Sequence, residues 1–226
     1  MVEIRSVSKT YREGEARRTV FRSLNASFVK GEVTCVTGRS GSGKSTLLNL
    51  ISGIDLPDEG QICIDGTDIA ALGDRDRTLV RRRRIGFVFQ FFNLIPTLTV
   101  EENLRLPLEL NATAPQTWDE RVNDLLERVS LADRRASFPE SLSGGEQQRI
   151  AVARALVHTP DILLADEPTG NLDVESGWAV LDLMSRLARE NGATLLLVTH
   201  SSEATAWADS VLHMRNGRLE AESQPF

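Results

Sequence analysis

A glycine-rich stretch near the start of the chain has the residue types and spacing of a phosphate-binding loop. Residues 38–45 read GRSGSGKS and match the pattern GxxxxGK[ST]. The stretch follows an apolar segment that predicts a strand and precedes STLLNLISG, which predicts a helix ended by Gly53. Glycines let such a loop turn its N–H groups toward a phosphate, and the helix start adds positive partial charge. The residues expected to bind a nucleotide here are Gly38, Arg39, Ser40, Gly41, Ser42, Gly43, Lys44, Ser45 and Thr46.

Within this loop, two side chains have distinct expected roles. Lys44 is expected to reach the β- and γ-phosphates of the nucleotide, and the Ser45 hydroxyl to bind Mg²⁺. The alternative is a chance glycine-rich turn, which the strand and helix on either side disfavour.

Two carboxylates end a second apolar segment. DILLADE, residues 161–167, predicts a buried strand whose carboxyl end carries Asp166 and Glu167. Ligands of open α/β sheets bind at this edge. We therefore expect Asp166 to hold Mg²⁺, through water, and Glu167 to polarise the attacking water. The alternative is a pair of solvated carboxylates at a strand end.

A second candidate anion site is LSGGEQQR, residues 142–149. A polar turn and two glycines precede a run of helix formers, so backbone donors would lie at a helix start. From these residues alone the stretch is only a plausible anion-binding helix start, in a chain that already has a phosphate loop.

The elements that position these residues alternate between strands and helices. Buried parallel strands are predicted at 32–38, 161–167 and 193–200, with a further strand at IGFVFQ, residues 85–90. The first 30 residues and residues 60–69 alternate apolar and polar side chains, which predicts an antiparallel layer. Residues 97–140 have helical periodicity.

This pattern predicts one α/β domain over residues 1–226, with a P-loop NTPase core containing a parallel sheet, an N-terminal antiparallel β layer and an inserted α-helical subdomain. The core and β layer are expected at about 1–90 and 161–226, and the helical subdomain at about 91–160.

Composition narrows the function classes. The net charge of −6 gives no support to nucleic-acid binding, so we expect no nucleic acid among the partners. The basic run at residues 81–84 is interpreted as a solvated helix end, with nucleic-acid binding as the alternative. Cys35 and Cys63 lie in apolar runs and are expected to be buried, reduced thiols of a cytosolic protein. We expect no cleaved signal peptide, no membrane-spanning helix and a frayed polar tail, AESQPF.

Together these motifs resemble the ATP-binding subunits of ABC transporters, over essentially the whole chain. The resemblance rests on six pieces in the family's order: Tyr11, the loop at 38–45, Gln90 ending IGFVFQ, LSGGEQQ at 142–148, the pair Asp166–Glu167, and NLD at 171–173 with His200.

The resemblance implies a role for each residue. ATP would lie between the phosphate loop of one subunit and Ser143, Gly144 and Gly145 of the other, which would cap its γ-phosphate. Gln90 would contact Mg²⁺ and the attacking water, and His200 would hold the γ-phosphate and align Glu167. Further roles fall to Tyr11, which would stack on adenine, and to Asp173, which would bridge the subunits.

Three of these residues have structural alternatives. Tyr11 could be an aromatic residue of an edge strand, Gln90 a polar residue at a strand end, and His200 a structural histidine. The other histidines, His158 and His213, are expected to be structural or exposed.

A narrower resemblance points to the lipoprotein-releasing and macrolide-exporting branch of the family. It is carried by residues 11–28, by FQFFNLIPTLTVEENLRLPLEL at 89–110, and by DEPTGNLD at 166–173. The family resemblance implies an ATPase using ATP and Mg²⁺, a second ATPase subunit in a homodimer or a heterodimer, integral membrane permease subunits as partners, and a peripheral place on the cytoplasmic face of the membrane. The narrower resemblance implies that the permease subunits move by mechanotransmission in an export-type system. The alternatives are the ATPase of an uptake system and a soluble ABC ATPase. Phe91, Phe92, Leu94 and Ile95 would form a docking patch if exposed, or part of the helical core if buried.

Overall fold

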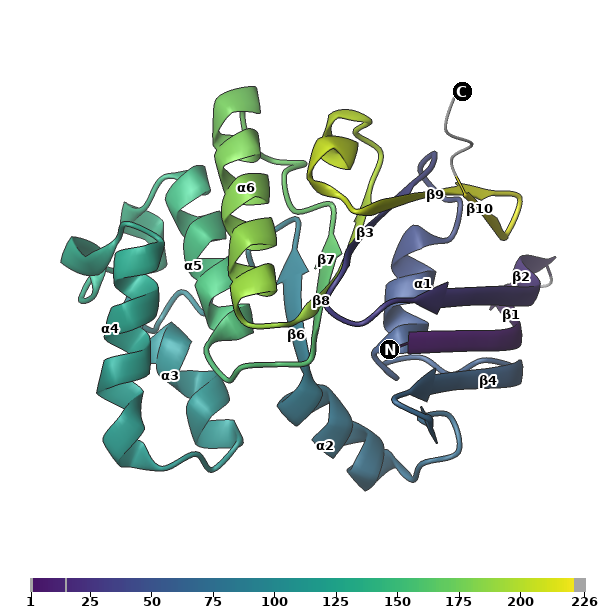
Figure 1. Ribbon diagram of the computed structural model, residues 1–226, viewed down its shortest axis with the longest axis horizontal. Helices are drawn as coiled ribbons and strands as arrows, with labels where there is room; N and C mark the ends of the chain where they lie inside the picture. Colours follow the sequence, from purple (N-terminus) through teal and green to yellow (C-terminus); the bar gives the residue numbers. More distant parts are fainter. Residues whose placement is uncertain (1, 15, 222–226) are drawn as a thin grey trace.

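Two β-sheets frame the molecule (Figure 1). The computed structural model describes residues 2–14 and 16–221, so the predicted frayed tail lies almost wholly outside the described residues. The first sheet is antiparallel, with strand order β2-β1-β4-β5. Its strands are β1 (Val2–Glu13), β2 (Ala16–Phe28), β4 (Glu59–Ile64) and β5 (Thr67–Asp68).

The second sheet has the order β10-β9-β3-β8-β7-β6 and is parallel except for β10. Its strands are β3 (Val33–Thr37), β6 (Ile85–Phe89), β7 (Ile162–Asp166), β8 (Thr194–Thr199), β9 (Ser210–Arg215) and β10 (Arg218–Ala221). β3, β7 and β8 each lie one residue inside both ends of the predicted ranges, because the end residues already belong to the turns.

The central strands are apolar on both faces because each face packs against a different core. In β8, Leu195 and Leu197 belong to one hydrophobic cluster, whereas Leu196 and Val198 belong to the other. The second cluster also contains Leu47 of α1 (Lys44–Ile51), which lies between the two sheets. This double burial is the reason that the strands read as continuous apolar runs.

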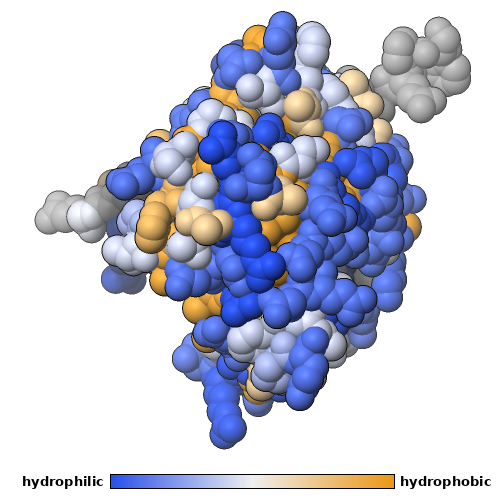
Figure 2. Space-filling view, turned by 90° about the vertical axis from the view of Figure 1, so that its left-hand side faces the viewer, coloured by the Kyte–Doolittle hydropathy of each residue, from blue (hydrophilic) through white to orange (hydrophobic). Residues whose placement is uncertain are grey.

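The first cluster lies beneath the helices on the left of Figure 1. These are α3 (Val100–Leu110), α4 (Trp118–Arg128), α5 (Gly144–Leu156) and α6 (Val174–Glu190), with 3-10 turns η1 (Pro115–Thr117), η2 (Ala132–Arg134), η3 (Pro139–Ser141) and η4 (Glu203–Trp207). Seen from that side, the surface is mostly hydrophilic with scattered apolar spots (Figure 2). The predicted fold class is confirmed: a parallel-sheet core carries an antiparallel layer on one side and helices on the other.

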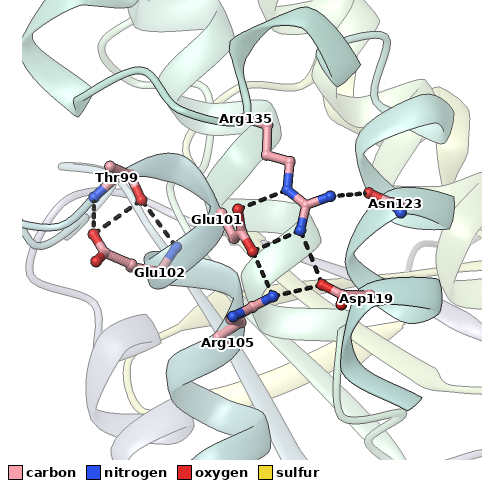
Figure 3. A network of polar contacts seen from close by, with 7 residues as sticks. All are labelled: Thr99, Glu101, Glu102, Arg105, Asp119, Asn123 and Arg135. Atoms are coloured by element: carbon pink, nitrogen blue, oxygen red, sulfur yellow. Dashed lines mark hydrogen bonds and ion pairs between the residues drawn. The ribbon is translucent and has the colours of Figure 1, made fainter. Parts of the chain in front are cut away.

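A network of charged side chains joins α3 to α4 (Figure 3). Arg135 donates to both carboxylate oxygens of Glu101 on α3, at 2.6 Å each, and to Asn123 and Asp119 on α4. Arg105 of α3 bonds to the same Glu101 and Asp119. The network therefore fixes the two helices and the segment after η2 relative to one another.

Several local predictions can be compared with the structure. The basic run does end a helix, α2 (Asp74–Arg84), but its arginines are not merely solvated, which corrects the expectation. Arg84 pairs with Asp65 and Asp161, and Arg81 donates to the carbonyl of Gly53 at 2.8 Å, because the helix end abuts these turns. Both cysteines are buried, as expected. Within residues 2–14 and 16–221, we find no helix that is long and apolar enough to span a membrane.

In the apolar loop after β6, residues 91–95, some side chains are exposed, as a docking patch requires, and others are partly buried. Phe91 is 72% exposed, whereas Leu94 packs against the helical core and Phe92 and Ile95 are half-buried. Phe92 and Asn93 have positive φ angles of 55° and 52°, so the turn sends successive side chains in different directions. Phe91 is therefore the most exposed of the four side chains.

Candidate functional site

The phosphate loop runs from the end of β3 to the start of α1, and two of its glycines adopt the left-handed conformation. Gly41 has φ +74° and Gly43, the N-cap of α1, has φ +109°. A Cβ atom on Gly43 would lie 2.7 Å from Cγ1 of Val20, and one on Gly38 would lie 2.8 Å from the carbonyl oxygen of Met214. The loop thus needs glycine both for its backbone angles and for its close packing against β2 and β9.

Lys44 is buried and lies against its own loop. Its ammonium donates to the carbonyl oxygens of Gly38 and Arg39, at 2.8 and 3.2 Å. It also lies 3.4 Å from a carboxylate oxygen of Glu167. From β2, Arg18 donates to the carbonyl of Gly41 at 2.7 Å and ties the loop to the antiparallel sheet.

Asp166 ends β7 in a partly buried position. Burial raises the pKa of its carboxyl, and the charge of Glu167 adds to the rise, while a hydrogen bond with Ser45 and the Lys44 ammonium oppose it. Its Oδ1 atom is buried and has no hydrogen-bond partner in the described part of the chain. A buried oxygen of this kind beside a serine hydroxyl fits a cation ligand.

Glu167 is held in a strained backbone conformation with φ +47°. Its N–H donates to the carbonyl of Val198 on β8 at 2.9 Å. The backbone N–H of His200 donates to Oε2 of Glu167 at 3.1 Å, and Nδ1 of His200 lies 2.8 Å from the same oxygen. Lys44 and His200 therefore bracket the carboxylate and fix its direction.

Gln90 follows β6 and lies over the turn after β7. Its side-chain amide donates to Asn171 at 3.2 Å, and the Asn171 amide donates to the Gln90 carbonyl at 3.0 Å. A Cβ atom on Gly170 would lie 2.8 Å from Nε2 of Gln90, so a larger residue at this turn would displace the Gln90 amide.

A cleft of about 730 Å³ brings most of the predicted residues together. The predicted residues that line it are Tyr11, Ser40, Gly41, Gly43, Lys44, Ser45, Thr46, Gln90, Asp166, Glu167 and His200. Phe91, predicted only as part of a docking patch, also lines the cleft, together with four residues for which no role was predicted, Arg18, Val20, Phe89 and Asn93. Gly38, Arg39 and Ser42 line a neighbouring cavity of about 1140 Å³ on the side of the β9–β10 turn.

The remaining predicted residues, Ser143, Gly144 and Gly145, do not join this cleft. Ser143 is the N-cap of α5 and forms a capping box with Glu146. Cβ atoms built on Gly144 and Gly145 would lie 3.4 Å from Leu172 and 3.3 Å from Ser176, the start of the α6 region.

The two candidate anion sites are therefore separated by the parallel sheet. Buried residues of α5 belong to the helix-covered cluster, and those of α1 to the cluster on the opposite face. Among the described residues that line the cleft, none comes from α5.

The two other histidines have structural contacts. His158 lies 3.3 Å from the carbonyl of Ile85, and burial lowers the pKa of its imidazole. His213 lies 2.6 Å from the Thr37 hydroxyl on β3.

Comparison with known proteins identifies the family of the chain. Residues 21–170 match the family model described as ABC transporter. The ABC transporter ATP-binding protein Rv0986 of Mycobacterium tuberculosis is 52% identical over 97% of this chain and 88% of its own length. The lipoprotein-releasing system ATP-binding protein LolD of Pseudomonas syringae pv. tomato is 42% identical over 97% of this chain and 96% of its own.

A solved structure extends the similarity to the fold. The dimeric ATP-binding cassette MJ0796 of Methanocaldococcus jannaschii, in a post-hydrolysis state bound to ADP and Pi, superimposes with a TM-score of 0.89 at 39% identity, covering 100% of both chains. With its phosphate loop, acidic strand end and capped α5, the chain belongs to the ABC transporter family as an ATP-binding protein.

Proposed function

We propose that this protein binds and hydrolyses ATP within a dimer and thereby drives a membrane transporter. One observation carries the proposal. The chain has a cleft with phosphate-binding and water-activating groups, and a separate helix start, capped by Ser143, on the other side of the sheet. A second copy turned head to tail would bring that helix start over the cleft.

In the cleft, each side chain has a role that its surroundings support. The N–H groups of the phosphate loop and the ammonium of Lys44 bind the β- and γ-phosphates of ATP, after Lys44 gives up the loop carbonyls that it contacts. Glu167 orients and polarises the attacking water, and His200 keeps its carboxylate in place. The ring of Tyr11, on the cleft wall, stacks on adenine.

The acidic edge fits Mg²⁺, which prefers carboxylate, hydroxyl and water oxygens. The buried Oδ1 of Asp166 has no hydrogen-bond partner among the described residues, and Ser45 interacts with the same carboxyl. Ser45, Asp166 and Gln90 would hold the ion, which when bound offsets the negative charge of the phosphates.

The dimer completes the site. Ser143, Gly144 and Gly145 of the second copy present backbone donors at the positive end of α5 to the γ-phosphate. The dimeric form of the related cassette MJ0796 supports this arrangement. Hydrolysis then depends on closure of the two copies, and loss of the γ-phosphate contact lets them separate.

The membrane partner is an integral permease of the lipoprotein-releasing or macrolide-exporting kind, with this protein held peripherally at the cytoplasmic face. The 42% identity to lipoprotein-releasing ATP-binding proteins supports the branch. Phe91, exposed at the rim of the cleft beside Gln90, offers an apolar contact for the permease. Replacement of Phe91 by serine should abolish copurification with the permease from detergent-solubilised membranes.

The test of catalysis is Glu167→Gln, which keeps the size of the side chain and removes the carboxylate. We expect phosphate release to fall about a hundredfold or more, because the water loses its activating group. ATP should stay bound, and gel filtration with ATP should show a stable dimer. Glu109→Gln, an exposed change on α3, should behave like the unaltered protein. Undiminished phosphate release by Glu167→Gln would contradict the assignment, and a monomer in ATP would contradict the dimer.

A further inference from the structure

Tyr11, the only tyrosine of the chain, is held by hydrogen bonds of its hydroxyl with Asp55 and Thr46 and by Lys9 over its ring. It is half-buried on β1 and lines the cleft with Thr46, near the start of α1. Its hydroxyl donates to Oδ2 of Asp55 at 2.6 Å. Burial and this hydrogen bond raise the pKa of the phenol, so the hydroxyl stays protonated and remains a donor.

Lys9 contacts the face of the Tyr11 ring. Its ammonium is buried and lies 5.0 Å from the ring centroid, and Lys9 is not among the described residues that line the cleft. It donates to Oδ1 of Asp55 and to the carbonyl of Leu56, at 2.7 Å each. Burial alone would raise the pKa of Asp55, but the hydrogen bonds from Lys9 and Tyr11 bring it below its ordinary value. The carboxylate therefore stays charged between the two side chains.

The backbone reinforces the same connection. The N–H of Thr10 donates to the carboxylate of Asp58 at 2.7 Å, and the N–H of Asp58 donates to the carbonyl of Ser8 at 2.9 Å. The outer end of β1 is thus fastened to the turn that follows α1. Because α1 begins in the phosphate loop, this turn links the ring to the element that holds the triphosphate.

The Lys9–Asp55 ion pair joins β1 to the turn after α1 and is only partly buried, because the Asp55 side chain is 29% exposed, so by itself the pair adds little stability. Here both members point at one aromatic ring, the cation toward its face and the carboxylate toward its hydroxyl. A ring fixed at its edge and its face loses little further freedom when a base stacks on it, which favours binding.

From this geometry, we infer that Lys9 and Asp55 are positioning residues, which hold the ring of Tyr11 in the orientation that stacks on the nucleobase. They would thereby favour binding of a nucleoside triphosphate over a triphosphate that has no base. The inference rests on the proposed function, because it places ATP in the cleft. The two residues touch neither the phosphates nor the attacking water, so their effect belongs to binding of the base and not to the chemical step.

The test uses the full chain with Lys9→Met, which keeps the apolar stem, and Asp55→Asn, which keeps the shape. We expect the KM for ATP to rise about threefold to tenfold in each variant, with kcat within about twofold, because contacts to the base are shared by ground and transition states. Lys9→Arg, which retains the cation, should recover most of the affinity. Lys30→Met, an exposed change of the same kind, should leave both constants unaltered.

A probe without a base separates positioning from general damage. Inorganic tripolyphosphate should inhibit the variants and the unaltered protein with the same Ki, because it occupies only the phosphate loop. As a direct readout, the near-ultraviolet phenolate absorbance of the single tyrosine should titrate at a lower pH in Asp55→Asn, because the phenol loses the charged acceptor that holds its proton.

Two results would overturn the inference while leaving the ATPase assignment intact. One is an unchanged KM for ATP in both variants. The other is a Ki for tripolyphosphate that rises in parallel with the KM, which would mean that the pair supports the phosphate loop. Failure of the unaltered protein to hydrolyse ATP would instead reject the proposed function itself.

Discussion

The Lys44 ammonium contacts groups that carry less negative charge than a triphosphate. It is buried against two loop carbonyls and one oxygen of Glu167. We expect Lys44→Ala to weaken binding of a fluorescent ATP analogue at least about tenfold, because hydrogen bonds to charged groups contribute more than neutral ones. The exposed Lys30→Ala should bind the analogue normally. Equal affinity in the two variants would show that the Lys44 ammonium does not contact the phosphates.

Not every side chain of the site could be predicted from the sequence. The phosphate loop and the pair Asp166–Glu167 have local patterns, and most of these residues do line one cleft. The Lys9–Asp55 pair joins positions 46 residues apart, and no local spacing indicates such a contact. The one available signal was that Lys9 is two residues from Tyr11, and therefore on the same face of a strand.

Among the strands, predictability follows burial. β3, β7 and β8 are covered on both faces, so their sequences are continuous apolar runs that predict buried parallel strands. The β9–β10 hairpin was not predicted, because its side chains are mostly half-buried or exposed and follow no clean alternation. It nevertheless matters to the site, since Met214 of β9 packs directly on Gly38.

The helical side of the molecule offers a test of stability with a defined pH dependence. Its ion-pair network centres on Arg135 (Figure 3). The Arg135 guanidinium lowers the pKa of Glu101 below its ordinary value of 4.5. The ion pair therefore stabilises the fold above pH 4.5, and its contribution is lost as pH falls through the lowered pKa.

We expect Arg135→Ala to lower the free energy of unfolding in urea by about 1 kcal/mol at neutral pH, a modest value because the guanidinium is partly exposed. The difference from the unaltered protein should shrink once Glu101 is protonated. Arg83→Ala, an exposed change at the end of α2, should have almost no effect on the free energy of unfolding, either at neutral pH or at the acidic pH where Glu101 is protonated. If Arg135→Ala lowered the free energy of unfolding equally at these two pH values, the loss would come from packing and not from the ion pair.

The two helices that begin at the candidate anion sites pack on opposite faces of the parallel sheet. α1 with the phosphate loop packs on one face, and α5 with Ser143 packs on the other. Because none of the described residues that line the cleft comes from α5, we propose that the second half of each site comes from another copy. A head-to-tail pair of identical chains would then have two equivalent sites.

This arrangement predicts complementation between two inactive variants. Lys44→Ala damages the cleft and leaves α5 intact. Ser143→Asp leaves the cleft intact and keeps a residue suited to the N-cap, but sets a carboxylate against the γ-phosphate. Each variant alone should release little phosphate. In a mixed dimer, the cleft of the Ser143→Asp chain meets the undamaged α5 of the Lys44→Ala chain.

An equal mixture should therefore recover about a quarter of the normal phosphate release, because half of the dimers are mixed and each has one intact site of two. Ser143→Asn, which also caps the helix but adds no charge, should be far more active alone than Ser143→Asp. If each site were formed within one chain, the mixture would be no more active than its components. Recovery in the mixture thus depends on ATP being bound between two chains, which distinguishes the head-to-tail dimer from any arrangement in which each copy works alone.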